Sequence, residues 1–435
     1  MDTPRPDAPM SEWLVFADAL QQRNHPLGEF IVLQSRGDTA ARDAWVKEKA
    51  VPFFGERLAK HVFRSLRFEW GWGFPEKAFI RCETAAEMSE VIDALLSHAI
   101  SKRITLLSLA GVVYTGATLD LSSVVAQLGE KLPPTMALEL VDLLATRSRT
   151  LNEARARQPL VTFGSLTPLW KAVRSLKVVV ADGRQLELGT IDAPQLESLT
   201  LHTLRFANDG VDDARACAAA QSLAAASMPR LRHFDMRLVE QLTVRKPEDE
   251  GSYALQKSVW NSPDSEFDTG FAPEGGANWV VEFGAALETL LSCPLESLAL
   301  TNFRSTDSFF DLLTELTLPK TLRTLDLSES SFSDRDLDWF TLNAEMFSAL
   351  ERLVALDTGI DEASAATLRT VVKNVEFSTA PPQRRAVWQE RIEDELEAFT
   401  DEDVDEEEAD RDEDDEGNPG PPLPKYRYVV VASEE

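Results

Sequence analysis

The chain has 435 residues, of which 43% are hydrophobic, and a formal net charge of −29. This length allows two or three ordinary domains or one elongated array of repeats. No stretch approaches the run of about 18 apolar residues that a membrane-spanning helix needs, so we expect no contact with a membrane. The negative charge disfavours binding to nucleic acid, which requires a basic face.

The positions of the charged residues and cysteines further restrict the class of protein to which the chain can belong. Between Glu390 and Glu416 there are 18 acidic residues against two arginines, a net charge of −16, which leaves −13 for the remaining chain. Cys82, Cys217 and Cys293 lie far apart and form no CxxC pair, and the N-terminus has no apolar signal segment. We therefore expect a reduced, cytoplasmic protein.

The first segment predicts a helical hairpin from Trp13 to Gln34 that is interrupted before Pro26. A proline suits the first turn of a helix, so the second helix is expected to begin there. A third helix is predicted from Asp38 to Lys49, with Asp38 or Thr39 as its cap. We expect residues 1–50 to form a helical cap at the N-terminal end of the molecule.

A short motif lies within this hairpin. The chain reads Ala17-Asp18, then Pro26, then Gly28-Glu29-Phe30-Ile31-Val32-Leu33-Gln34. This pattern resembles the repeat-companion domain found at the N-terminus of bacterial leucine-rich-repeat proteins, and it departs at Ala19, where that family usually has Trp. The resemblance covers the 22 residues from Trp13 to Gln34. It implies a bacterial leucine-rich-repeat protein and transfers no catalytic residue.

The rest of the chain is organised by a recurring phrase of the form apolar-x-x-apolar-x-apolar. Its strongest copies begin at Leu295, Leu322 and Leu350, with spacings of 27 and 28 residues, which is typical of stacked repeats. Each phrase predicts a short strand. Weaker copies begin at Phe63, Ile104, Val173, Leu196, Leu231 and Val372.

Helical patterns lie between the phrases. They are predicted for residues 85–98, 136–145, 211–225, 280–291, 308–316 and 361–371. Strand followed by helix at this period predicts an α/β leucine-rich-repeat solenoid of the ribonuclease-inhibitor type over residues 51–380, with a parallel sheet on its concave side. The repeats are degenerate, because the position that usually holds Asn is occupied by Val112, Leu204, Phe303, Ser330 and Thr358.

Two regions depart from the repeat. The first is an insertion at about 243–276, rich in Pro, Asp, Ser and Gly, which is either functional or disordered. The second, 381–423, is predicted to hold a helix, a disordered acidic tract and a Pro-rich linker. The final segment, 424–435, has strand propensity. It is predicted to cap the sheet edge or, as a less favoured alternative, to extend a partner's sheet.

No residue pattern predicts catalysis, a cofactor or a metal. The five histidines are scattered, and the chain contains no HExxH or phosphate-binding glycine loop. The series Asp401-x-Asp403-x-Asp405 lacks the turn glycine of a calcium loop. We therefore expect no enzyme activity and no bound cofactor.

The candidate partner-binding residues are those that flank the last apolar position of each strand, where a solenoid presents its concave face. Each could also be an ordinary solvated strand residue. They are Arg67, Glu69, Lys177, Thr200, His202, Asp235, Arg237, Thr301, Asp326 and Ser328. Trp70 and Trp72 could add an aromatic contact patch, or they could close the junction with the N-terminal helices, which is the favoured interpretation.

These features favour a non-catalytic module, monomeric and without nucleic acid or membrane as partner, that binds a protein on its concave face. The alternative is an acidic immunity or inhibitor protein that neutralises a basic enzyme or toxin, because surface charge can speed capture. A hydrolase or transferase would need a cluster of reactive side chains, which the sequence does not show.

Overall fold

The computed structural model describes residues 4–5, 8–113, 118–133, 136, 138–147, 160–181, 184–204, 211–238, 279–301, 310, 313–314, 316–330, 332, 334–356 and 358–378. The insertion predicted at 243–276 lies outside these residues, as does everything predicted for 381–435. The helix predicted at 308–316 lies mostly outside them. The expectations for these segments stay predictions.

The N-terminal segment forms three helices, α1 (Met10–Gln21), α2 (Pro26–Ser35) and α3 (Thr39–Ala59). The His25 side chain accepts a hydrogen bond from the Leu27 amide and so caps α2, and Asp38 caps α3 by accepting from the Ala41 amide at 2.8 Å. α3 is longer than predicted and continues past residue 50, with a break at Gly55, where φ is 71°.

Eleven strands of the described chain form one long sheet, and their spatial order follows their order in the sequence. All neighbours are parallel except β1 and β2, which are antiparallel. In spatial order the strands are β1 (Leu66–Trp70), β2 (Pro75–Cys82), β3 (Leu106–Val113), β5 (Leu140–Arg147), β7 (Val178–Ala181), β9 (Ser198–Leu204), β10 (His233–Leu238), β11 (Ser297–Thr301), β12 (Thr324–Asp326), β13 (Arg352–Ala355) and β14 (Asn374–Phe377).

Two elements of this sheet correct the sequence prediction. Residues 136–145, predicted as a helix, contain the first part of β5, because pairing with β3 and β7 on both sides overrides the helix propensity of Leu, Glu and Ala. The repeat phrase is in fact present there, as Leu138-x-x-Val141-x-Leu143, with all three side chains buried. β2 was not predicted, because it alternates Ala78, Ile80 and Cys82 toward the core without that phrase.

A second, three-stranded parallel sheet was also not predicted. It pairs β4 with β6 and β6 with β8. Its strands are short and carry no complete repeat phrase. They are β4 (Thr118–Asp120), β6 (Leu160–Ser165) and β8 (Arg184–Glu187).

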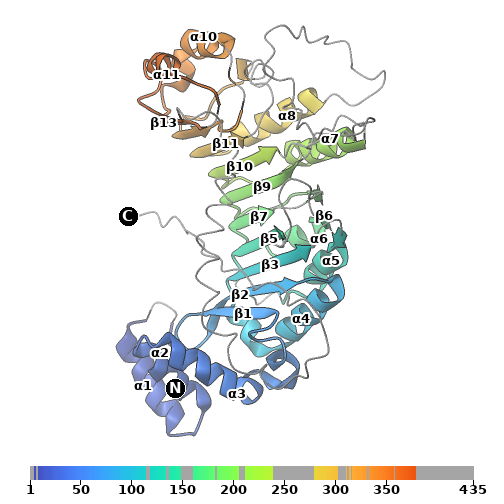
Figure 1. Cartoon of the computed structure of the whole chain (residues 1–435), viewed down its shortest axis with the longest axis vertical. Helices are drawn as coiled ribbons and strands as arrows, with labels where there is room; N and C mark the ends of the chain where they lie inside the picture. Colours follow the sequence, from blue (N-terminus) through green and yellow to red (C-terminus); the bar gives the residue numbers. More distant parts are fainter. Residues whose placement is uncertain are drawn as a thin grey trace, which may run out of the picture.

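The remaining helices connect the strands. Figure 1 shows α4 to α7 in a row along one side of the main sheet, with α10 and α11 at the end that holds β13. They are α4 (Ala85–Ser97), α5 (Ser122–Lys131), α6 (Thr167–Ala172), α7 (Val211–Ala224), α8 (Trp279–Leu291), α10 (Asp334–Leu342) and α11 (Glu362–Leu368), with short 3-10 turns η1 (Ala99–Arg103) and η2 (Ala344–Phe347).

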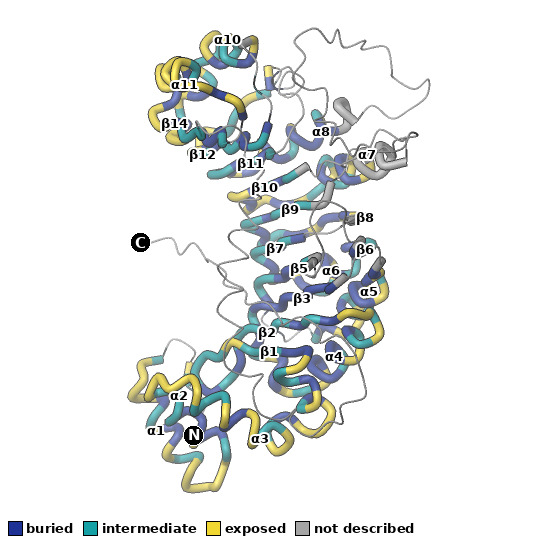
Figure 2. Tube along the Cα trace, viewed as in Figure 1, coloured by how far each residue is buried: buried dark blue, intermediate teal, exposed yellow. Residues whose placement is uncertain are grey.

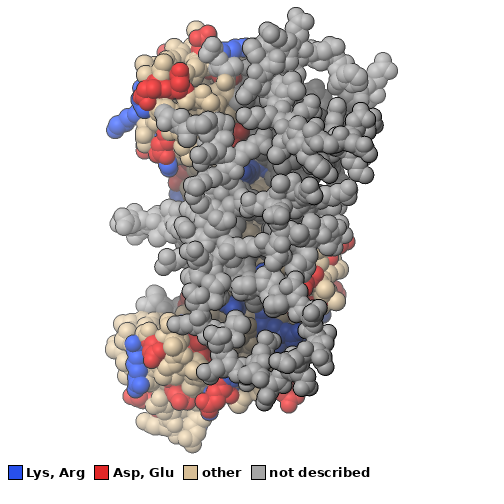
Figure 3. Space-filling view, viewed as in Figure 1, with Lys and Arg blue, Asp and Glu red and all other residues tan. Residues whose placement is uncertain are grey.

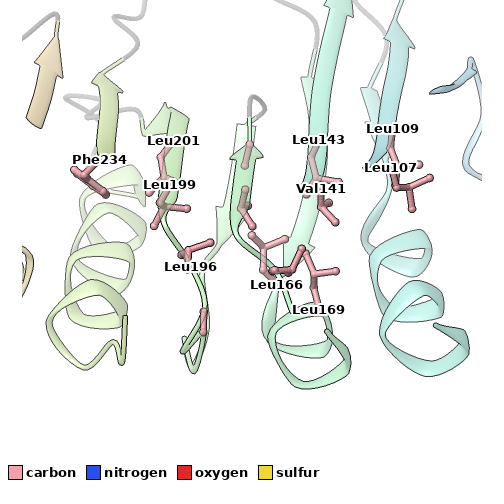
Figure 4. Packing of buried hydrophobic residues seen from close by; sticks show 14 of the residues in the cluster. Leu107, Leu109, Val141, Leu143, Leu166, Leu169, Leu196, Leu199, Leu201 and Phe234 are labelled. Carbon is pink, nitrogen blue, oxygen red and sulfur yellow. The ribbon is translucent and has the colours of Figure 1, made fainter. Parts of the chain in front are cut away.

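The core lies between the main sheet and these helices. Figure 4 shows Leu107, Leu109, Val141 and Leu143 on neighbouring strands above the helices, and all four are fully buried. Figure 2 shows the middle strands mostly in buried and intermediate colours, whereas exposed residues concentrate on α1, α3, α10 and α11. The protein is therefore a mixed α/β chain with a leucine-rich-repeat-like arrangement of strands and helices.

Candidate functional site

The candidate site is the face of the main sheet opposite the core, from β9 to β14, which we call the polar outward face. Side chains alternate along a strand, so the residues between the buried leucines point to this face. The strand register places Thr200, Asp235, Ala299 and Asp326 side by side in one row. The row continues through Val354 to Glu376. Three of the predicted residues, Thr200, Asp235 and Asp326, therefore lie in one row on this face.

A histidine and a carboxylate meet at the β9 end of this face. His202 Nε2 lies 3.2 Å from Asp235 Oδ2, and 30% of the histidine side chain and 41% of the aspartate side chain are exposed. The pair joins neighbouring strands β9 and β10. It holds both groups at the surface, where a partner can reach them.

An ion pair crosses the centre of the face. Arg237 Nη2 of β10 donates to Glu329 Oε2, beyond the end of β12, at 2.6 Å. The bond passes across β11, where Thr301 stands beside Arg237 in the register. The two partners are 92 residues apart in the chain, and their contact links the repeats of β10 and β12 across β11.

Asp326 occupies a partly buried position in this row. Its Oδ1 accepts a hydrogen bond from the Ser328 amide at 2.9 Å. Burial raises the pKa of the Asp326 carboxyl, and the nearby charge of Asp235 raises it further, whereas Ser328 and Arg352 lower it. The Ser328 hydroxyl in turn accepts from the Leu356 amide at 3.1 Å, which links β12 to β13.

The far end of the face carries a bidentate ion pair. Arg352 donates from Nε and Nη2 to the two carboxylate oxygens of Glu376, each at 2.7 Å. This pairing lowers the pKa of Glu376 and raises that of Arg352. Such a fork holds both side chains in a fixed geometry.

The predicted residues from the first strand lie elsewhere. Arg67 and Glu69 are at the β1 end of the sheet, where Glu69 forms an ion pair with Lys77 of β2 at 2.7 Å. The Trp70 ring contacts Phe30 of α2, with centroids 4.5 Å apart, and also packs near aromatic residues of α3. Trp72 is partly buried against the same core. Trp70 thus lies at the junction with the N-terminal helices.

Lys177 belongs to a different feature, which we call the charge ladder. The residue after the first leucine of each phrase donates its amide to the same residue of the preceding repeat, at 2.7–2.9 Å. The charges of these residues alternate along the whole series. The series is Glu139, Lys177, Glu197, Arg232, Glu296, Arg323 and Glu351.

Three ion pairs of the described residues lie along the charge ladder. Lys177 Nζ is 2.9 Å from Glu139, Arg232 is 3.3 Å from Glu296 and Arg323 is 3.6 Å from Glu351. Figure 3 shows acidic and basic side chains intermixed over the visible described surface. The ladder and the residues Glu329, Arg352 and Glu376 were not predicted. The alternating sign after each first leucine was the signal that could have revealed the ladder.

The described residues show no group of three or more His, Cys, Asp or Glu side chains that could hold a metal ion. None of the helices in the described ranges combines the length and the apolarity needed to cross a membrane. What the polar outward face offers is a set of paired charges and small hydroxyl groups. Such a surface suits recognition of a complementary polar surface.

No protein-family model matches the chain, and no curated protein matches its sequence. Among solved structures, a protein from Bacteroides fragilis is 13% identical with a TM-score of 0.46, over 67% of this chain and 70% of that chain. The leucine-rich repeat-containing protein LegL7 from Legionella pneumophila is 13% identical with a TM-score of 0.31, over 68% of each chain. At these TM-scores neither likeness assigns a property to the chain.

Proposed function

We propose that this protein is a non-catalytic leucine-rich-repeat solenoid that binds a protein partner through the polar outward face. The observation that supports this most directly is the row of Thr200, Asp235, Ala299 and Asp326, aligned across four strands. Around that row, charged side chains are held by neighbours of opposite sign, as in the Arg237–Glu329 pair. The proposed function is therefore recognition of a partner by this arrangement of surface side chains.

Preorganisation is the physical reason to favour this surface. Ordering a long flexible side chain costs about 0.5–1.5 kcal/mol when a complex forms. Arg237, Glu329 and Arg352 are already held by ion pairs in the free protein, so a partner meets a surface whose rotamers are largely set. The mixture of both signs favours a partner with a complementary pattern of charges over a uniformly charged polymer.

The domain organisation forms part of the proposal. Helices α1 to α3 would be the N-terminal cap of the solenoid, related to the repeat-companion domain, and would shield its first apolar layer. The contact between Phe30 and Trp70 supports that role. We propose that the protein acts as a cytoplasmic monomer and that its partner is neither nucleic acid nor a membrane.

The proposal is tested by affinity capture with the tagged full-length chain from a lysate of its source organism. Thr301→Arg places a long side chain at the centre of the polar outward face. Thr341→Arg makes the same change on the exposed surface of α10, away from the face, and is the matched control.

We expect specific proteins to be retained by the wild type and by Thr341→Arg, and to be reduced about tenfold or more with Thr301→Arg, equivalent to about 1.4 kcal/mol. Circular dichroism and thermal unfolding would show that both variants fold. Equal capture by both variants, or no specific capture by the wild type, would contradict binding through this face.

A further inference from the structure

From β3 to β7 the outward face of the main sheet is largely apolar, unlike the polar outward face from β9 to β14. In β3, Leu107 and Leu109 belong to the core, so alternation places Leu106, Ser108 and Ala110 on the opposite, outward face. These three residues are only 4%, 2% and 3% exposed. Leu106 and Ala110 are buried although they lie outside the core cluster of the described residues.

The neighbouring strands continue this apolar surface. The register places Leu140 beside Leu106 and Val178 beside Leu140 in one row. The same alternation places Leu144 and Val180 outward, and both are partly buried. We call this surface the apolar stripe, and its members are Leu106, Leu140, Leu144, Val178 and Val180.

A carboxylate lies within the apolar stripe. The Ser108 hydroxyl donates to Asp142 Oδ2 at 3.2 Å, and Asp142 is 0% exposed. A charge in such surroundings is stabilised by a cation with good geometry, and a guanidinium suits a carboxylate best. An occupant that carries apolar side chains and a basic group therefore matches the stripe and would add to the contacts that Asp142 already makes.

The same row of the sheet is polar farther along. Beyond Val178 it continues with Ser198, His233, Ser297 and Thr324. The apolar stripe is thus confined to β3, β5 and β7. Among the described elements, Figure 1 shows the helices beside these strands on the core side only.

We propose that the apolar stripe is the docking site of the chain's own C-terminal segment, Tyr426–Ala432. The segment reads Tyr-Arg-Tyr-Val-Val-Val-Ala. In an extended conformation Arg427, Val429 and Val431 project to one side. The two valines cover the stripe while the Arg427 guanidinium meets Asp142. In this placement the C-terminal segment binds the face of the main sheet, whereas the sequence prediction had it capping the edge of that sheet.

The length of the chain permits this placement. The described residues end at Ser378, directly after β14, and the 47 residues 379–425 lie between Ser378 and Tyr426. Seven strand spacings of about 4.8 Å separate β14 from β5, roughly 34 Å in all. A Gly/Ser-like coil of that length has an r.m.s. span of about 38 Å, and the acidic and Pro-rich composition of this segment favours more extended conformations, so its reach covers the distance.

Because the C-terminal segment is tethered to the sheet, it also occupies the apolar stripe for a larger fraction of the time. A linker whose span matches the distance to the site gives the attached segment a high effective concentration, so even a weak contact is populated. The inference goes beyond the proposed function and does not depend on it, because the polar outward face begins at β9. The docked segment would leave Thr301 and Asp326 accessible to a partner.

Site-specific photocross-linking in the full-length chain tests the proposal. A p-benzoylphenylalanine replaces Leu140 in the apolar stripe, and in a matched control it replaces Thr324, which stands in the same row on β12. After irradiation, cross-linked peptides of the monomer are identified by mass spectrometry. Val178 serves as a second labelling position if the substitution at Leu140 prevents folding.

We expect cross-links from position 140 to residues 424–435 of the same molecule, and at most a tenth as many from position 324. The double variant Val429→Asp, Val431→Asp should reduce the cross-link about tenfold without changing the circular dichroism spectrum. Cross-links to residues 243–276, to a second copy or to none of these would overturn the proposal. So would a cross-link that is indifferent to the two aspartates.

Discussion

At the scale of single residues, Asp326 shows how a position on the polar outward face combines opposing effects. Burial and the charge of Asp235 disfavour its ionised form, whereas the Ser328 amide and Arg352 favour it. The net result is a raised pKa, so burial is the largest of these effects. A carboxylate kept in such a place lowers stability at neutral pH.

We predict that Asp326→Asn stabilises the protein at pH 7 by up to about 1 kcal/mol. A raised pKa means that the folded state holds its proton more tightly than the unfolded state does. The penalty is therefore absent below the ordinary value of 3.8, grows as pH rises through the folded pKa and is complete at neutral pH. Asparagine removes the charge and keeps an acceptor for the Ser328 amide.

Urea unfolding at pH 7 and at about pH 3 measures this effect. The increase in the free energy of unfolding caused by Asp326→Asn should be present at pH 7 and vanish at about pH 3. Asp338→Asn, on the exposed surface of α10, is the control and should change stability little. A less stable Asp326→Asn variant at pH 7 would mean that attraction to Arg352 outweighs burial.

At the scale of elements, the repeat phrase was an accurate guide from β9 onward. The copy predicted to begin at Val173 was placed three residues too early, because Leu176, Val179 and Ala181 are the buried positions of that repeat and Val178 faces outward. The strands β9 to β14 lie where their phrases predicted them, because each leucine is buried between sheet and helix. β5 was misassigned because helix-forming residues hid its phrase, and β2 because it has none. Contacts such as Arg237–Glu329 join residues 92 positions apart, so no local pattern predicts them.

We predict that the charge ladder contributes measurably to stability and that the order of its charges matters. Arg323→Glu would create three consecutive acidic positions, Glu296, the new glutamate and Glu351, in adjoining repeats. Exposed ion pairs contribute only about 0.2–1 kcal/mol each, but reversal replaces attraction by repulsion on both sides. We expect a loss of about 1–2 kcal/mol in the free energy of unfolding at low salt.

A variant in which the two neighbouring charges of the ladder are also reversed provides the control for Arg323→Glu. Adding Glu296→Arg and Glu351→Arg to Arg323→Glu restores attraction on both sides of position 323 but sets a like charge beside Arg232, so it should recover about half of the loss. Salt near 1 M, where the Debye length is about 3 Å, should shrink the difference between the variants. Equal destabilisation by the single and the triple variant would show that the ladder's charges do not act as a series.

At the scale of the whole molecule, the net charge is divided between the acidic tract from Glu390 to Glu416 and the remaining chain, which carries −13 with charges of both signs. The tract carries a net −16 of the total −29. Charge concentrated in this way acts at long range on a basic partner and speeds its association. It adds little to specificity, which we assign to the polar outward face.

Once a partner is identified, its association rate tests whether the acidic tract speeds association while the polar outward face provides specificity. For a basic partner, raising the salt from about 50 to 500 mM should slow association with the full chain about tenfold, and much less with a chain lacking Glu390–Glu416. Dissociation should change little in either case. Association that is indifferent both to salt and to the deletion would remove any electrostatic role of the tract.

The alternating signs of the charge ladder constrain how such a chain can evolve. Copying a single strand–helix unit would set two like charges against each other, as between a second Glu296 and its original. Copying two adjacent units together would preserve the sequence of signs from Glu139 to Glu351. Growth or shrinkage of the array by pairs is therefore electrostatically neutral, whereas a change by one unit is not.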